Sequence, residues 1–343
     1  MVSYSIDAFG GTRRHVEQVQ AMAEVQRYEL VAAYLALTGS SVVEAVAIAT
    51  VRLQIATVED LIKNDRKNLD LVQREFDAGR VAKSDVLTAA AQLASDRTQL
   101  PALRQQLNVA RHALAVLSSR APGQWTPPDF ELSEFTLPLE VPLSVPSELV
   151  RQRPDILAAE ALLHADMAAI GVATAELYPS LTLSASFTRS GGALADVFGP
   201  AASDVLSAGG SLDVPLFRGG GLVAQRDQAI DAYRAQLATW QQTVLQAFGQ
   251  VADSLTSLEE DSEAVATSRD ALEIAGASLA LQRLSFAAGK TSALQLIIAE
   301  NTYSTARLGS VRAQGQQMTD TAQLLIAVGG GWWNGANVGE PAH

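Results

Sequence analysis

The chain carries the same turn motif twice, each time after a long stretch of regularly spaced apolar residues. The first copy reads "EFDAGR" at 75–80 and the second "SFAAGK" at 285–290. Stepping back from Phe286 in sevens meets an apolar residue at every step: Leu279, Leu272, Val265, Leu258, Val251, Val244, Leu237, Ile230 and Val223. A strict seven-residue period keeps one helix face against its neighbours. We therefore expect a long helix before each turn motif.

The first copy keeps the same register. Stepping back in sevens from Phe76 meets Leu69, Ile62, Ile55, Ile48, Ser41 and Tyr34. Gly10 precedes Gly79 by the same interval that separates Gly220 from Gly289, and this interval is roughly 100 Å of helix at about 1.5 Å per residue. Because glycine readily adopts the left-handed conformation that ends helices, a return helix should follow each turn and run antiparallel.

Polar residues flank both turns and are candidates for the ends of the hairpins. They are Gly79, Arg80, Ser84 and Asp85 in the first copy, and Gly289, Lys290, Ser292 and Gln295 in the second. Ser292 and Gln295 fit a capping box, whereas Ser84 and Asp85 are acceptable caps without the full box. An ordinary hairpin turn would explain both motifs for folding alone.

The segment between the repeats contains a connector, a helix and short strands. Residues 120–150 are rich in proline and indicate a connector, and a helix should run from Pro154 to the break at Tyr178-Pro179. Apolar and small polar residues alternate at 2–6, 181–188 and 211–216, which indicates strands. Such strands suit a membrane barrel with a wet lumen or a soluble half-buried sheet, and alternation alone leaves both open.

These elements define the expected organisation. The first repeat occupies 1–119, the connector 120–150, the second repeat 151–332 and a tail 333–343. The fold class expected is mainly α, with two long antiparallel helical hairpins, a small β part and an internal duplication.

Composition excludes several classes of function. The net charge of −12 does not suit nucleic acid, which needs clustered Lys and Arg. The chain has no cysteine, and its four histidines lack metal-ligand spacing. Gly219-Gly220-Gly221 lacks the lysine of a phosphate-binding loop. No nucleophile is aligned with a base. We expect no enzyme activity, no metal and no cofactor.

The longer motifs carry a family resemblance that spans essentially the whole chain. The segment "RQRPDILAAEALLHADMAAIGVATAELYPSLTLSASF", the openings "VSYSIDAFG" and "PLFRGGG", the paired tips and "AVGGGWW" resemble the TolC-like outer membrane efflux channels. They are most similar to the NodT-type lipoprotein branch, which serves resistance-nodulation-division pumps. The most specific residues are Arg153, Pro154, Asp155, Gly171, Tyr178, Pro179 and Ser180.

The resemblance implies a homotrimer in the outer membrane of a Gram-negative bacterium. Each protomer of that family contributes four strands to one barrel in the lipid bilayer and helical hairpins to a periplasmic tunnel. The channel itself is passive, and an inner membrane pump supplies the energy for export. A periplasmic adaptor docks on the hairpin tips. The tip residues named above would then form the docking and closing end.

The sequence departs from the family pattern in two places. Family return helices often read Asp-Val-Leu-Asp-Ala-Gln after the tip, but here only Asp85 keeps a family acid. Repeat one also begins directly at its second strand, so we expect a truncated chain, with a helix, a strand and any lipid-bearing cysteine encoded ahead of Met1. Three strands per protomer would leave an unpaired barrel position, so we expect inefficient pore formation.

One alternative is a periplasmic adaptor or another coiled-coil scaffold without a pore, which would also show long antiparallel helices. An adaptor typically has one hairpin, whereas this chain has two hairpins separated by amphipathic strands. The duplication therefore favours the export duct.

Overall fold

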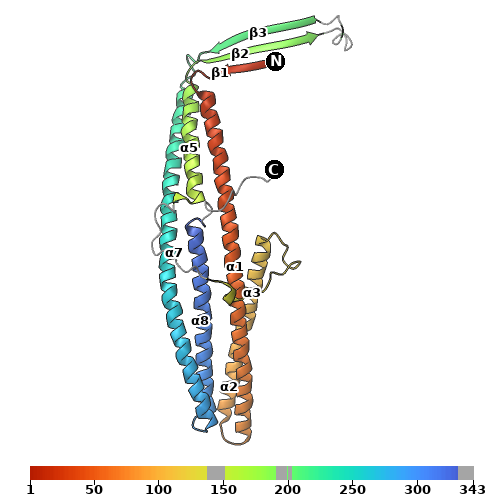
Figure 1. The fold of residues 1–343 in the computed structure, drawn as a ribbon, viewed down its shortest axis with the longest axis vertical. Helices are drawn as coiled ribbons and strands as arrows, with labels where there is room; N and C mark the ends of the chain where they lie inside the picture. The colour runs from red at the N-terminus through yellow and green to blue at the C-terminus, as the bar shows by residue number, and fades with distance from the viewer. Residues whose placement is uncertain (137–150, 191–198, 200–202, 331–343) are drawn as a thin grey trace. The chain divides into compact units, whose positions relative to one another are not determined.

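The computed structural model describes residues 1–136, 151–190, 199 and 203–330 (Figure 1). Its elements are β1 (Val2–Ile6), α1 (Gly11–Asp77), α2 (Lys83–Arg97), α3 (Gln99–Leu117), η1 (Leu132–Glu134), α5 (Pro154–Ala175), β2 (Ser180–Ser190), β3 (Ser203–Asp213), α7 (Gly221–Ala287) and α8 (Ala293–Ala327). The described residues fall into two compact units, one from 1–32 and 151–246 and one from 33–136 and 247–330. The later part of the predicted connector and the predicted tail lie outside the described residues.

The duplication is confirmed in the element boundaries. Helices α1 and α7 have 67 residues each, which is about 100 Å at the helical rise. When the two copies are aligned on Gly79 and Gly289, α7 begins and ends where α1 does. In the same alignment α8 begins with α2 and ends with α3. The predicted fold class, mainly α with two long hairpins and a small β part, is correct.

The predicted heptad stripe is the packing face of α7. From Val251 to Phe286, the register positions and the positions three residues after them are buried or half-buried, and most of the remaining residues are exposed. The alternating spacing of three and four residues matches the seam of packed helices. The seven-residue apolar period thus correctly predicted which face of α7 packs against neighbouring helices.

The second unit has a core shared by both hairpins. One buried cluster joins residues of α1, α2, α3 and α8: Val58, Ile62, Leu93, Leu103 and Leu308. A further cluster pairs α7 with α8 through Leu279, Leu296 and Ala299. Each long helix therefore packs against the return helices of its own hairpin, which are α2 and α3 for α1 and α8 for α7. The first hairpin also packs on α8.

The return arm of the first hairpin is divided, which differs from the single helix expected. Helix α2 ends at Arg97 and α3 begins at Gln99, with Thr98 between them in a helical conformation. Pro101 lies in the first turn of α3. Because proline has no backbone N–H and is tolerated only in a first turn, it explains why a new helix starts here.

The first unit contains a three-stranded antiparallel sheet in the order β1-β2-β3 (Figure 1). Its register places like residues opposite one another. Leu181 lies between Ile6 and Leu212, and Thr182 lies between Ser5 and Ser211. The predicted alternation therefore becomes one largely apolar face and one face of small polar residues.

The predicted position of the third strand is wrong. The alternation placed it at 211–216, whereas β3 runs from Ser203 to Asp213. Its first residues read Ser-Asp-Val-Leu-Ser-Ala-Gly-Gly, a weak strand pattern that pairing with β2 nevertheless orders. Pro215 has no N–H for a sheet ladder, which is consistent with the strand ending before it.

The described start of the connector is fastened to the first hairpin. The Arg52 guanidinium donates to the Phe130 carbonyl over 2.8 Å and lies 3.4 Å from the Asp129 carboxylate. Arg111 binds the same carboxylate at 2.5 Å, and Leu132 is buried. These contacts hold the start of the connector against α1 and α3.

Helices α1 and α5 each contain an apolar window long enough to cross a membrane by length and composition. The mean hydropathy of these windows is 1.7 and 1.6, and only 22% of each is buried within the chain. Helices of soluble assemblies pass the same test, so this is weak evidence for a spanning helix. It does show apolar helix surface that the single chain leaves uncovered.

Candidate docking tips and helix–strand junction

Both hairpins turn through the same backbone motif. Gly79 and Gly289 have φ of 71° and 67°. The Gly79 N–H donates to the Phe76 carbonyl and the Arg80 N–H to the Glu75 carbonyl, and the second copy repeats this pattern with the same spacing. This is a Schellman ending, in which glycine avoids the penalty that a side chain pays at positive φ. The prediction that both glycines end their long helices is confirmed.

The cap expected at Ser292 is confirmed, whereas the full capping box and the cap at Ser84 are not. Ser292 is the N-cap of α8, and its hydroxyl accepts the Gln295 N–H over 3.4 Å. The Gln295 side chain accepts from the Thr291 hydroxyl, so these contacts give only half of a capping box. In the first copy the N-cap is Ala82, and Asp85 accepts its N–H over 3.1 Å. Ser84 is therefore not the cap.

The two tips carry cations in different surroundings. Arg80 lies 3.3 Å from the Glu75 carboxylate, and the Lys83 ammonium sits 5.2 Å from the centre of the Phe76 ring. Lys290 occupies the position equivalent to Arg80, where the residue equivalent to Glu75 is Ser285. Among the described residues no ion pair is recorded for Lys290, and its side chain is exposed.

The tips are held together by apolar contacts. Val72 of α1, Val86 of α2 and Ile297 of α8 form one buried cluster, against which Phe76 packs. Figure 1 shows the two turns at the same end of their unit. The structure thus brings the predicted tip residues of both repeats into one neighbourhood.

The Arg-Pro-Asp motif forms the start of α5. Pro154 occupies the first helical position, and the Arg153 guanidinium makes two hydrogen bonds to the Asp155 carboxylate, at 3.0 and 2.8 Å. Asp155 also accepts the Ile156 N–H over 3.0 Å. A carboxylate in a first turn satisfies free amides and complements the helix dipole. Within this chain, the motif fixes where the helix begins.

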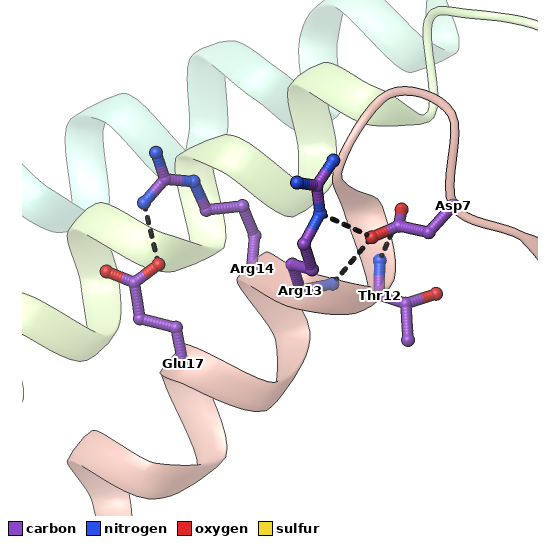
Figure 2. Close-up of polar contacts among 5 residues, drawn as sticks. All are labelled: Asp7, Thr12, Arg13, Arg14 and Glu17. Carbon is purple, nitrogen blue, oxygen red and sulfur yellow. Dashed lines mark hydrogen bonds and ion pairs between the residues drawn. The ribbon is translucent and has the colours of Figure 1, made fainter.

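Gly171 allows α5 to approach α1 closely. A Cβ on Gly171 would lie 2.7 Å from Cγ of Arg14, so only glycine admits this side chain. Arg14 reaches Glu17 at 2.6 Å, as Figure 2 shows, and Glu17 also lies 3.2 Å from His164 of α5. The motif glycine is therefore explained by packing.

Asp7 caps the start of α1 (Figure 2). Its carboxylate accepts the Thr12 N–H at 3.1 Å, the Arg13 N–H at 3.0 Å and the Arg13 Nε at 3.1 Å. Partial burial would raise the pKa of Asp7, but these hydrogen bonds and the Arg13 charge outweigh it and lower the pKa. An ionised Asp7 thus holds the passage from β1 into α1.

The remaining motif residues carry the chain from α5 into β2. Tyr178 stacks on Phe9 with ring centres 4.7 Å apart, Pro179 follows it, and Ser180 begins β2 opposite Asp213. A cavity of about 710 Å³ lies beside this junction and is lined by residues from β1, α1, α5 and α7. The seven predicted motif residues thus lie at the start of α5, at its contact with α1 and in the passage from α5 into β2.

Sequence reasoning missed a set of buried carboxylates in the hairpins. Asp65, Asp96 and Glu300 are 3%, 5% and 7% exposed. The signal was present, because Asp65 stands three residues after Ile62, at a position where the same stripe otherwise carries Val58 and Val72. Among the described residues no group of three His, Asp or Glu is placed to hold a metal ion.

The fold and these junctions define a class of protein. The two long helices, α1 and α7, have equal lengths, and each is followed by a turn and an antiparallel return segment. The chain also contains a small amphipathic sheet, and capping contacts fix where the helices next to it begin. These are features of a channel-forming protein.

The chain belongs to the outer membrane efflux protein family, whose model matches residues 1–119 and 145–330. Members of this family are channel proteins. The chain is accordingly an outer membrane channel component of a tripartite efflux system. The expected resemblance to the TolC-like channels is confirmed.

Three comparisons illustrate the similarity. The chain is 29% identical over 333 residues to nodulation protein T of Rhizobium leguminosarum bv. trifolii, covering 96% of this chain and 71% of that protein. It is 28% identical to the pyoverdine export outer membrane protein OpmQ of Pseudomonas aeruginosa, covering 96% and 69%. The solved outer-membrane channel OprN matches with a TM-score of 0.84 and 27% identity, covering 96% of this chain and 74% of OprN.

Proposed function

We propose that the chain assembles as a homotrimer, with its sheet in the outer membrane and its helical hairpins in the periplasm. The trimer would form a passive duct that carries small molecules outward, and an inner membrane pump would supply the energy. The family assignment and the two hairpins of matching length support this arrangement.

The sheet supplies the observation that carries the membrane part of the proposal. Every residue of β3 is exposed in the single chain. Apolar side chains on the sheet are among the most exposed, and Val2, Phe187 and Leu206 are 72%, 61% and 77% exposed. Alternating strands with such a face are stable where lipid covers the apolar side and water the polar side.

Assembly and conduction test this part directly. Native mass spectrometry of the detergent-extracted chain should give three times the mass of one chain. Planar lipid bilayers should show stepwise but infrequent conductance, because the described sheet supplies three strands and an unpaired strand edge makes pore formation inefficient. A chain that stays monomeric in detergent and in lipid, with no conductance, would contradict the proposed duct.

The tips are proposed to dock a periplasmic adaptor protein. The residues assigned are Gly79, Arg80, Ser84, Asp85, Gly289, Lys290, Ser292 and Gln295, at the exposed ends of both hairpins. Asp85 is tied to the Ala82 amide and Arg80 to Glu75, whereas Lys290 has no recorded ion pair among the described residues. We infer that Lys290 meets a carboxylate of the adaptor.

Charge reversal at Lys290 tests the docking role. Cells that express the full chain with its own pump and adaptor should accumulate more ethidium when they carry Lys290→Glu, with unchanged trimer in the membrane. Arg269→Glu is the matched control, because Arg269 is exposed on α7, the helix that leads into the turn of Lys290, and lies away from the tip. Equal ethidium levels in the two variants would remove Lys290 from the docking surface.

A further inference from the structure

Each hairpin contains a pair of aspartates that face each other across its two helices. Asp65 of α1 lies within hydrogen-bonding reach of Asp96 of α2. Asp261 of α7 lies within reach of Asp320 of α8. Ionised carboxylates only accept hydrogen bonds, so two of them cannot bond to each other without a proton.

An unpartnered oxygen marks the place for that proton in both pairs. Oδ2 of Asp65 and Oδ2 of Asp261 are buried, and neither has a hydrogen-bond partner among the described residues. A buried polar atom of this kind costs stability unless a partner reaches it. A proton shared with the opposing aspartate would satisfy it.

The return-helix aspartate is arranged as the acceptor in each pair. Gln92 donates its side-chain amide to Asp96 over 2.8 Å, and Gln316 donates to Asp320 over 3.0 Å. In both cases the glutamine lies four residues before the aspartate. Gln99 gives Asp96 a second bond, at 3.0 Å. The return-helix aspartate therefore already accepts side-chain hydrogen bonds, whereas the buried oxygen of the long-helix aspartate has none.

The two pairs also occupy the same place in the heptad pattern. Asp65 lies two whole heptads before Gly79, and Asp261 lies four whole heptads before Gly289. Both therefore fall at the inner seam of their hairpin. The arrangement recurs in two hairpins whose sequences differ at these positions, since the residue equivalent to Asp65 in the second copy is Ala275.

The other charges near Asp65 already have partners of their own. Glu300 of α8 faces Asp65 but accepts from Asn68 and from Arg283 of α7, the latter over 3.2 Å. At more exposed positions of the same helices, Arg307 of α8 lies 3.4 Å from Asp60, and Arg104 of α3 lies 3.1 Å from Glu59. Among the described residues, no cation is recorded against Asp65 or Asp261.

We propose that Asp65 with Asp96, and Asp261 with Asp320, are two proton-binding sites that fasten each long helix to its return arm. The carboxylic O–H of the long-helix aspartate donates to the carboxylate of its partner. The proposal depends on the hairpins alone and holds whether or not the chain conducts.

The electrostatics agree with this placement. Burial, then the hydrogen bond to Asp96 and the charges of Asp96 and Glu300, raise the pKa of Asp65 to about 7. Burial, then the hydrogen bond and charge of Asp320, raise the pKa of Asp261 to about 6. A raised folded pKa stabilises the folded hairpin at low pH, and this contribution is lost as pH rises through the folded value.

Hydrogen exchange of the full chain in detergent measures the effect. After correction for intrinsic exchange, local opening of α2 should increase about tenfold between about pH 6 and pH 8, and that of α8 about tenfold between about pH 5 and pH 7. Asp65→Asn and Asp261→Asn should each flatten the dependence in their own hairpin, because an amide donates at every pH. Asp70→Asn and Asp253→Asn, on exposed positions of the same helices, should leave it unchanged.

Infrared difference spectroscopy of the wild-type chain provides a readout that does not rely on the variants folding. At about pH 5.5, where exposed carboxyls are largely ionised, the carbonyl stretch of protonated carboxylic acids should be present and should weaken in each Asn variant. Absence of this band in the wild type, or exchange that is flat with pH, would overturn the proposal. If Asp70→Asn weakened this band as much as Asp65→Asn does, that result would also overturn the proposal.

Discussion

A close approach of α8 to α1 gives the sharpest stability prediction. Gly315 of α8 is buried against Thr50 of α1. A Cβ at Gly315 would lie against the Thr50 Oγ1, 2.5 Å from its Cγ2 and 3.0 Å from its Cβ. Ordinary contact begins at 3.4 Å. Gly315→Ala should therefore push the two helices apart or force Thr50 from its rotamer.

The magnitude follows from two opposing effects. Alanine in a helix interior gains about 1 kcal/mol over glycine. Overpacking costs about 1 to 3 kcal/mol, and the upper part of that range applies because Thr50 is β-branched and the Thr50 Cβ itself is too close. The net loss should be about 1 to 2 kcal/mol, which lowers Tm by roughly 2 to 5 °C in a chain of this size.

Gly309 supplies a matched control on the same helix. A Cβ there meets nothing within 4 Å, so Gly309→Ala should gain about 1 kcal/mol. Thr50→Ala removes the clashing atoms, so Thr50→Ala/Gly315→Ala should recover most of the loss relative to Thr50→Ala alone. The assay is thermal unfolding by circular dichroism in one detergent at one scan rate, because channel proteins often unfold irreversibly.

The signs decide the outcome. If Gly315→Ala and Gly309→Ala shift Tm in the same direction, the close approach of α8 to α1 is not as described. If Thr50→Ala fails to rescue Gly315→Ala, the strain does not arise at Thr50.

Three further predictions concern the turns and helix starts. Asp7→Asn should lower stability to urea at about pH 7, and this loss should shrink as pH falls below the ordinary Asp pKa of about 4, because a lowered folded pKa stabilises above the ordinary value and this contribution is lost as pH falls through the folded pKa. Gly79→Ala and Gly289→Ala should each cost about 1 to 2 kcal/mol, measured by the same thermal assay, because both glycines have positive φ. Asp155→Ala should cost about 1 to 2 kcal/mol and increase hydrogen exchange in the first turn of α5, because the helix start loses its carboxylate and Arg153 loses two hydrogen bonds.

Each of these predictions can fail clearly. A constant difference between Asp7→Asn and wild type across the pH range would show that Asp7 is not the titrating group. No change in either glycine variant would contradict the left-handed turns, because a Cβ at both sites is otherwise free of neighbours within 4 Å. Unchanged exchange in α5 would show that Asp155 does not fix its start.

Local rules in the sequence determined the long elements. The heptad series, the glycines after it and the proline at 154 gave the lengths of α1 and α7 and the start of α5, because helix period, helix ending and helix start depend on neighbouring residues. Strand alternation located β1 and β2 for the same reason. The longer motifs identified the family.

Other features needed the tertiary structure. The position of β3 depends on pairing with β2, and a strand whose residues alternate poorly gives no local signal. Arg14 over Gly171 joins α1 to α5, and Asn68 with Glu300 joins α1 to α8, so both contacts link segments far apart in the sequence. The local sequence pattern allowed Ser84 as the N-cap of α2. In the structure the N-cap is Ala82, whose N–H donates to the Asp85 carboxylate.

The carboxylate pairs show which features the sequence determines and which depend on the tertiary structure. The sequence by itself determined that Asp65 and Asp261 fall on the inner seam of a helix, since the heptad count is local. Only the tertiary structure decided that each faces another aspartate. The partner aspartate comes from the return helix, which follows the glycine turn. A seven-residue period describes the faces of one helix and does not say which residue of another helix packs against each face.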